Sequence, residues 1–297
     1  MRRVSRRRFL LGLGAAAALL SGGCSSLAAG RTLTLGYIAW DENVANSALV
    51  KVLAEERLGY DKVELRLSGV EEVFRSVASG RVDAFLDVWL PNHRRLLRTA
   101  GRGAILLERP WYEGQTEYGI AVPDYMRDVR SIADLDRSGA RVITGIEPDA
   151  VLMRRIRTHV IPAYDLDLKL AGASTPAMLD ALERAYRSRE PFVFLAWSPH
   201  WMNEVYDFHY LEDPKDAQGD IVDGSTLHSL LSPDLEDRHP AARALIGNMR
   251  LTKEQINSLE LRILEEGDPR RGVEAWLENN EEAVRPWVEA AKRAGGA

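Results

Sequence analysis

Cysteine is almost absent from this 297-residue sequence, which contains only Cys24, near the amino terminus. A lone cysteine excludes an intrachain disulfide and leaves no thiolate ligand or nucleophile beyond residue 24. The six histidines show no zinc-like spacing: His93, His159, His200, His209, His228 and His239. The HExxH, GxSxG and P-loop patterns are also missing. We therefore expect no enzymatic activity, no metal site and no cofactor.

The first 30 residues have the composition of an export signal followed by a short tether. Five arginines within the first eight residues precede an apolar stretch over 9–20 that is too short to span a bilayer comfortably. The run SRRRFL at 5–10 resembles a twin-arginine export signal, a type that carries folded proteins.

Cys24 follows this apolar stretch and the small residues Ser21, Gly22 and Gly23. The arrangement resembles a bacterial lipoprotein cleavage site, at which the cysteine becomes the lipidated first residue of the mature chain. The alternative is a free thiol that is discarded with the signal. We expect an exported, extracytoplasmic protein that a lipid holds at the cell membrane.

Basic residues are too few and too scattered in the mature chain for a nucleic-acid-binding surface. Removing the five arginines of residues 1–23 from the 39 basic residues leaves 34 against 44 acidic ones, a formal charge of −10. An acidic surface without a basic cluster argues against nucleic acid as a partner and is compatible with a small cationic ligand.

The mature chain alternates between strand-like and helix-like segments, which indicates an α/β fold. We expect strands at 32–39, 62–67, 82–88, 105–107, 116–122, 141–145, 166–171 and 192–197, and helices at 44–58, 70–79, 150–161, 175–187, 240–250, 252–266 and 271–294. No strand is convincing after residue 225. We expect lobe one at 31–122 plus 224–297 and lobe two at 123–223, with each sheet flanked by helices.

A tryptophan stands at the end of the expected strand 192–197 and directly after the expected strands 32–39 and 82–88: Trp197, Trp40 and Trp89. Open α/β sheets bind ligands at the carboxyl ends of their strands. Tryptophan is the best aromatic partner for a cation, and aromatic boxes hold quaternary ammonium groups. These three indoles are therefore the candidate ligand site. The other four tryptophans are assigned to packing: Trp111, Trp201, Trp276 and Trp287.

Several segments together resemble the glycine betaine/proline betaine family of substrate-binding proteins of ABC importers, including its choline-binding branch. The segments are GYIAWDENVA (36–45), VFRSVASGRVDAFLDVWLPNH (73–93), EYGIAVP (117–123), FLAWSPHWM (194–202), LEDPK (211–215) and WLENNEEAVRPW (276–287). The resemblance implies a two-lobed, type II periplasmic-binding-protein-like fold that closes on ligand in the cleft between the lobes. It also implies a monomer that docks on an ABC permease with its ATPase subunits. Its aromatic cage would be formed by Trp40, Trp89, Tyr118 and Trp197.

Polar contacts to the ligand are expected from a few further residues. Glu42 corresponds to an acid that lies beside the cation in choline binders of this family, although it would also suit the first turn of a helix. Asp87 could add negative potential at the site, but it is expected to make a structural hydrogen bond. His200 is a candidate for binding a ligand carboxylate, and a capping or packing role is the alternative. The backbone of Gly145 and Ile146 is a further candidate for binding that carboxylate. Glu147, next in the chain, would repel such a group.

The expected function is the capture of glycine betaine or proline betaine for an ABC importer. Choline or carnitine in the same role is the first alternative. A sensory module that presents the ligand to a receptor would need the same fold and is the second.

Overall fold

The computed structural model describes residues 31–101, 103–219, 222 and 224–296. The export signal, the lipidation site at Cys24 and most of the tether lie outside these residues, so they stay predictions. Residues 31–297 form one compact unit. Among the described residues, no helix combines the length and the apolar composition that crossing a membrane requires.

The first sheet has five strands in the order β2-β1-β3-β11-β4. They are β1 (Thr32–Tyr37), β2 (Lys62–Leu67), β3 (Ala84–Leu90), β4 (Ile105–Leu106) and β11 (Thr226–Leu231). The expected β-α-β-α-β opening is confirmed, because β1 pairs in parallel with both β2 and β3. Gly36 lies on β1 where a Cβ would come within 2.6 Å of Val73 Cγ2, so glycine lets α2 approach the sheet closely.

Strand β11 corrects the expectation that no strand follows residue 225. Its sequence, TLHSLL, pairs antiparallel with β3 on one side and with β4 on the other. The segment is short and carries His228 and Ser229, so it lacks the continuous apolar run that marks a buried strand. Both of these polar residues are buried in the sheet, where the Nδ1 atom of His228 lies 2.8 Å from the carbonyl oxygen of Leu107.

The second sheet has the order β10-β6-β9-β7-β8 and is also mixed. Its strands are β6 (Glu117–Pro123), β7 (Val142–Thr144), β8 (Lys169–Ala171), β9 (Val193–Ser198) and β10 (Phe208–Tyr210). Strand β6 pairs antiparallel with β9 and β10. Residues 117–122 therefore belong to the second sheet, although the expected boundary placed them in lobe one. A small third sheet joins β5 (Tyr112–Glu113) and β12 (Leu251–Thr252).

The longer helices lie where the periodicity predicts them, whereas the short helices at 94–100, 202–205 and 235–238 were not predicted. The helices are α1 (Asp41–Arg57), α2 (Val70–Ala78), α3 (Arg94–Ala100), α4 (Val151–Arg155), α5 (Ile161–Tyr164), α6 (Thr175–Ser188), α7 (Met202–Val205), α8 (Leu235–Arg238), α9 (Pro240–Asn248), α10 (Lys253–Glu266) and α11 (Pro269–Ala294). A 3₁₀ helix, η1 (Ile132–Arg137), and a π-helical turn, η2 (Ile156–Val160), complete the set. The helix expected at 150–161 is thus divided into α4, η2 and α5.

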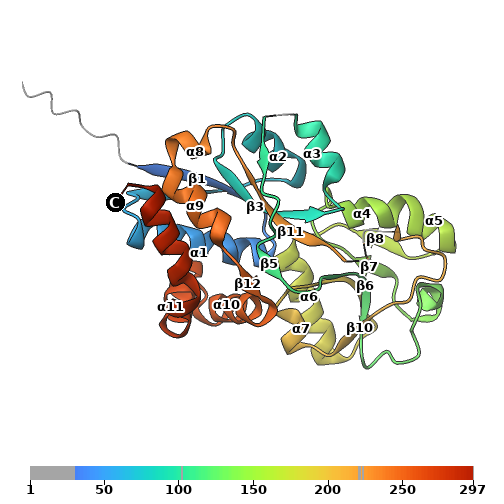
Figure 1. Ribbon diagram of the computed structural model, residues 1–297. Helices are drawn as coiled ribbons and strands as arrows, with labels where there is room; N and C mark the ends of the chain where they lie inside the picture. The colour runs from blue at the N-terminus through green and yellow to red at the C-terminus, as the bar shows by residue number, and fades with distance from the viewer. Residues whose placement is uncertain (1–30, 102, 220–221, 223, 297) are drawn as a thin grey trace, which may run out of the picture. The chain divides into compact units, whose positions relative to one another are not determined.

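The carboxyl-terminal helices pack around the first helix. Figure 1 shows α9, α10 and α11, in orange and red, beside the blue helix α1, and α1 contacts all three. The face of α1 that points away from solvent is almost wholly buried. It includes Leu49, Val52 and Leu53. This packing fixes the position of the first turn of α1, which carries two acidic residues into the candidate site.

Candidate functional site

Trp40 and the acidic residues Asp41 and Glu42 are positioned by the junction between β1 and α1. Trp40 is the N-cap residue of α1, and its carbonyl oxygen accepts hydrogen bonds from the N–H groups of Asn43 and Val44. Asp41 and Glu42 form the first turn, where negative charge favours the helix dipole. The Trp40 side chain is 6% exposed, and Glu42 is 1% exposed.

The other aromatic residues come from three strands in both large sheets. Trp89 lies near the end of β3 in the first sheet, and Trp197 lies near the end of β9 in the second. Tyr118 on β6 is the direct antiparallel partner of Trp197. The ring centroids of Trp89 and Tyr118 are 5.9 Å apart, so residues from different sheets meet here.

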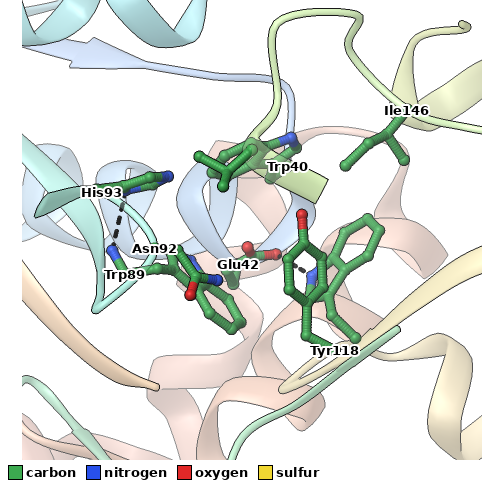
Figure 2. A pocket seen from close by; sticks show the side chains of 9 residues that line it. Trp40, Glu42, Trp89, Asn92, His93, Tyr118 and Ile146 are labelled. Atoms are coloured by element: carbon green, nitrogen blue, oxygen red, sulfur yellow. Dashed lines mark hydrogen bonds between the residues drawn. The ribbon is translucent and has the colours of Figure 1, made fainter. Parts of the chain in front are cut away.

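These side chains surround a single cavity. Its lining comprises Trp40, Glu42, Trp89, Asn92, His93, Tyr118, Ile146, Val151 and Trp197. Figure 2 shows Trp40 above, Trp89 and Tyr118 below and Glu42 between them at the back. Six of the eight sequence-predicted ligand residues therefore lie around one space. No lysine or arginine is among the lining residues that the structure describes.

The indole N–H groups of all three lining tryptophans donate to carboxylates. Trp197 Nε1 donates to Glu42 Oε2 at 2.9 Å, and Trp40 Nε1 donates to an oxygen of Glu147 at 2.9 Å. Trp89 Nε1 donates to Asp87 Oδ1 at 3.1 Å. Each indole therefore offers the cavity its aromatic surface rather than a free donor. Such a wall suits a methylated cation, which has no hydrogen-bond acceptor on its head.

Acidic side chains are concentrated behind the aromatic lining, where burial favours their neutral forms. Burial raises the pKa of Glu42 well above its usual range, and the nearby Asp87 and Glu260 carboxyls add to the effect. Burial also raises the pKa of Asp87 to about 8. The predicted structural hydrogen bond of Asp87 is present as the contact with Trp89.

Asn92 and His93 line the cavity, although the sequence analysis gave them no role. They follow Trp89-Leu90-Pro91 directly, so the turn after a tryptophan-bearing strand was the available signal. The Trp89 backbone N–H donates to His93 Nδ1 at 3.1 Å, and burial lowers the pKa of His93 to about 3. His93 is thus neutral with its proton on Nε2. Val151, at the start of α4, is the third lining residue that was missed.

His200 and Gly145 do not line the cavity. His200 is fully buried behind Trp197, with ring centroids 4.7 Å apart, and its Nε2 lies 3.2 Å from Asp41 Oδ2. The Gly145 N–H donates to the carbonyl oxygen of Ala171 at 2.8 Å, which removes it as a donor to a ligand. A Cβ at Gly145 would also lie 2.2 Å from Met153 Sδ, so the glycine serves close packing.

Ile146 does line the cavity, and its neighbour Glu147 is held in place by two other residues. Glu147 accepts hydrogen bonds from the Thr175 N–H and hydroxyl group and from the Trp40 indole. These hydrogen bonds join the segment before α4 to Trp40 and to α6. Glu147 lies outside the lining of the cavity.

A family model described as the substrate binding domain of ABC-type glycine betaine transport system matches residues 31–279. The glycine betaine/carnitine transport binding protein GbuC of Listeria monocytogenes is 29% identical over 166 residues, which cover 55% of this chain and 54% of that relative. The glycine betaine-binding periplasmic protein OusX of Dickeya dadantii is 22% identical over 285 residues, covering 81% and 84% of the two chains.

Solved structures share the architecture. Lactococcal OpuAC, in a closed conformation with glycine betaine, matches with a TM-score of 0.76 and 29% identity over 87% of this chain and 99% of that one. An ABC-transporter choline binding protein in complex with choline matches with a TM-score of 0.78 and 23% identity, over 90% and 98%. The two-lobed α/β fold expected from the sequence is thereby confirmed.

Proposed function

Because this chain belongs to the family of substrate-binding domains of ABC-type glycine betaine transport systems, we propose that it captures a quaternary ammonium compound in the cavity between Trp40, Trp89, Tyr118 and Trp197. The loaded protein then delivers the compound to an ABC permease with its ATPase subunits. The observation that carries this proposal is the meeting of four aromatic side chains from both sheets around one cavity backed by Glu42.

The binding chemistry follows from the ligand's head group. A trimethylammonium group has no N–H, so it gains its affinity from aromatic faces, nearby carboxylates and close enclosure. Each well-placed ring contributes about 0.5–2 kcal/mol, so four rings support binding in the micromolar range.

Glycine betaine and proline betaine are the first candidate ligands, as the family description suggests. Choline is the second, and one observation favours it: Glu42 lies in the lining, and none of the described lining residues is a lysine or arginine that could pair with a ligand carboxylate. The polar tail of either ligand would meet Asn92 and the Nε2–H group of His93.

Closure of two lobes about the ligand would complete the cage. We propose that the lobes follow the two large sheets, so that lobe two begins with β6 at Glu117 rather than at 123. Export, lipid anchoring through Cys24 and a monomeric state are the remaining parts of the proposal. The sequence of the first 24 residues supports the first two.

Titration calorimetry of the purified protein against glycine betaine, proline betaine, choline and carnitine tests the proposal. At least one compound should bind with micromolar affinity and shift the intrinsic tryptophan fluorescence. Replacing Trp197 with Ala should weaken that binding at least tenfold, which corresponds to about 1.4 kcal/mol. Failure of all four compounds to bind would overturn the proposed ligand class.

A further inference from the structure

Three arginines surround another hollow, the arginine hollow, which lies between the edge strand β4 and helix α9. They are Arg109, which follows β4, Arg243 on α9 and Arg250, which follows α9. The other lining residues are Ile105, Leu106, Leu107, Glu108 and Gly247. None of these residues lines the aromatic cavity, so the arginine hollow is a separate feature of the first sheet region.

Helix α9 leaves room for one of the guanidinium groups. Arg243 and Gly247 are four positions apart, so they lie on the same face of the helix. A Cβ at Gly247 would come within 2.5 Å of Arg243 Nη1. Glycine at this position therefore lets the Arg243 side chain lie along the helix at the arginine hollow.

Arg250 is half-buried, and part of its guanidinium group lacks an acceptor. Its Nη1 donates to the carbonyl oxygen of Met249, and its Nε is buried without a hydrogen-bond partner among the described residues. Burial and the nearby Arg109 both lower the pKa of Arg250. An anion in the arginine hollow would supply an acceptor and offset this repulsion.

Carboxylates balance only part of this positive charge. Arg109 Nη2 lies 3.6 Å from Glu113 Oε1, and both side chains are exposed. Within the part of the chain that the structure describes, neither Arg243 nor Arg250 forms an ion pair. The lining residues carry three positive charges against the single negative charge of Glu108. The arginine hollow is therefore cationic, although the chain as a whole has more acidic than basic residues.

Ile105 places an exposed apolar side chain beside the arginines. It is 45% exposed and belongs to β4, at the edge of the first sheet. Guanidinium groups next to an exposed aliphatic side chain suit the headgroup region of a membrane, where lipid phosphates lie next to acyl chains.

The described part of the chain begins close to α9. The Arg31 guanidinium carbon lies 4.4 Å from the centre of the Tyr60 ring, and the rings of Tyr60 and His239 are 5.6 Å apart between centroids. His239 directly precedes α9, and Arg243 lies about 6 Å further along the helix axis. The chain from Cys24 to Arg31 spans at most about 25 Å. A lipid on Cys24 would therefore keep α9 within reach of the membrane surface.

We propose that the arginine hollow is a membrane-docking surface that binds the phosphate groups of anionic lipids. The inference rests on the lipid anchor of the proposed function, because the anchor keeps this surface near the bilayer. The planar guanidinium group forms paired hydrogen bonds with phosphate oxygens, and anionic lipids attract clustered arginines. Ile105 enters the headgroup region beside them. The contact orients the anchored protein on the membrane.

Vesicle sedimentation of an unlipidated protein tests this surface apart from the anchor. The mature chain, residues 24–297 with Cys24→Ser, should bind vesicles of equal parts phosphatidylglycerol and phosphatidylcholine about tenfold more tightly than vesicles of phosphatidylcholine alone. Added salt should reduce the difference. Both vesicles present the choline headgroup, so a contact of that headgroup with the aromatic cavity would not favour the mixed vesicles. Equal binding to the two vesicles, or binding to neither, would overturn the proposal.

Removing two positive charges locates the contact. In the Cys24→Ser protein, Arg243→Gln combined with Arg250→Gln should lower the affinity for the mixed vesicles about tenfold. Arg157→Gln combined with Arg184→Gln removes two exposed arginines from the second half of the fold and should leave that affinity unchanged. Equal losses in the two double variants would mean that net charge rather than the arginine hollow drives binding.

A fluorophore that responds to its surroundings shows which face meets the lipid. Attached through Ile105→Cys in the Cys24→Ser protein, it should shift to the blue when the mixed vesicles are added. Val205 on α7 is 49% exposed, close to the 45% of Ile105, so Val205→Cys is the matched control and should give no shift. An unchanged signal at position 105 would contradict docking by this face.

Inorganic phosphate distinguishes a lipid surface from a site for a soluble anion. If calorimetry shows phosphate binding that Arg243→Gln with Arg250→Gln abolishes, while the mixed vesicles do not bind, the arginine hollow is a site for free phosphate and the membrane assignment fails.

The same variants separate this inference from the proposed function. Arg243→Gln with Arg250→Gln should bind the quaternary ammonium ligand as tightly as the wild type, because neither residue lines the aromatic cavity. Vesicle binding by a protein that binds none of the four quaternary ammonium compounds would leave the docking surface in place and overturn the proposed ligand. Mass spectrometry of the wild type tests the lipid on Cys24 independently.

Discussion

At the residue scale, the most distinctive feature of the site is the pairing of indole N–H groups with carboxylates. Besides the three pairs at the cavity, Trp201 Nε1 donates to Asp41 Oδ1 at 2.9 Å. These bonds fix the planes of the rings, so they orient the aromatic faces before a ligand arrives. Preorganisation of this kind raises affinity by lowering the cost of ordering side chains on binding.

The substitution Trp197→Phe distinguishes the contribution of the indole N–H to ligand affinity from that of the aromatic face. Trp197→Phe keeps a ring in the cavity but leaves the buried Glu42 Oε2 without its donor. We expect ligand affinity to fall about fivefold, or about 1 kcal/mol, which is less than the loss for Trp197→Ala. Trp287→Phe, on α11 and outside the lining, is the matched control and should bind normally. Equal losses for Phe and Ala at position 197 would mean that the ring face contributes nothing.

Glutamine at position 42 tests the importance of the charge. It has the shape of glutamate and can still accept the Trp197 N–H, but it carries no charge. We expect Glu42→Gln to weaken choline binding at least tenfold, or about 1.4 kcal/mol, because the cation loses its counter-charge. Glycine betaine, which has no net charge, should lose less. Calorimetry with both ligands measures the ratio, and an unchanged ratio would show that Glu42 does not select between them.

The sequence predicted the aromatic half of the site better than its polar half. Trp40, Trp89 and Trp197 could be found because each follows a strand whose apolar run is easy to recognise. His200 follows the strand that carries Trp197, but hydrogen bonds to Asp41 and to the Met202 N–H hold it behind the cavity. The contact with Asp41 joins residues 159 positions apart, so the local sequence pattern could not predict it.

At the element scale, the first sheet depends on a strand from the far end of the chain. β11 lies between β3 and β4, so residues 226–231 complete a sheet whose other strands lie within residues 32–106. The alternation of β1, β2 and β3 with α1 and α2 is local and was predicted correctly. The position of β11 was not, because a six-residue segment with a buried His and Ser lacks both the period of a strand and a continuous apolar run.

Asp83 makes polar contacts with three elements of this sheet region. Its carboxylate accepts the Thr34 N–H on β1 at 2.7 Å and forms an ion pair with Arg238 on α8, while its carbonyl oxygen accepts the N–H of Ser232 after β11. The carboxylate is nearly buried. Asp83 therefore joins β1, the end of β11 and α8 at the point where β3 begins.

Alanine at position 83 should destabilise the fold without touching the cavity. The change leaves a buried N–H group on Thr34 without an acceptor, and we expect a loss of about 2 kcal/mol in unfolding free energy. For a domain of this size that corresponds to a melting temperature lower by roughly 4–8 °C. Asp234→Ala removes the half-exposed partner of the same Arg238 and should change stability by less than about 1 kcal/mol. Similar melting temperatures for the two variants would contradict this assignment.

At the scale of the whole molecule, polar contacts join the two large sheets around the cavity, in addition to the aromatic contact between Trp89 and Tyr118. Glu42 with Trp197, Trp40 with Glu147, and Asp41 with Trp201 each link an element of the first sheet region to one of the second. Hydrogen bonds of this kind re-form with water when two bodies separate, so their net cost is small. Contacts of modest energy are compatible with the proposed closure of the two lobes on a ligand.

One further link lies outside the cavity and offers a test of closure. Helix α2 begins after Gly69, which has no side chain to cap it, and Asp149 Oδ2 accepts the Val70 N–H at 2.7 Å instead. The helix therefore receives its N-terminal cap from the segment that precedes α4, in the second half of the fold. Because opening would separate the two, the cap stabilises only the closed arrangement. A side chain at such a position contributes about 1 kcal/mol.

Replacing Asp149 with Ala should therefore weaken ligand binding about fivefold, although Asp149 does not line the cavity. Calorimetry measures the affinity, and small-angle X-ray scattering at increasing ligand concentration measures how much ligand is needed for compaction. Asp128→Ala, at an exposed aspartate of the same half, is the control and should behave as the wild type. A normal affinity for Asp149→Ala would mean that the cap forms equally well in the open protein, so that closure depends on the cavity contacts alone.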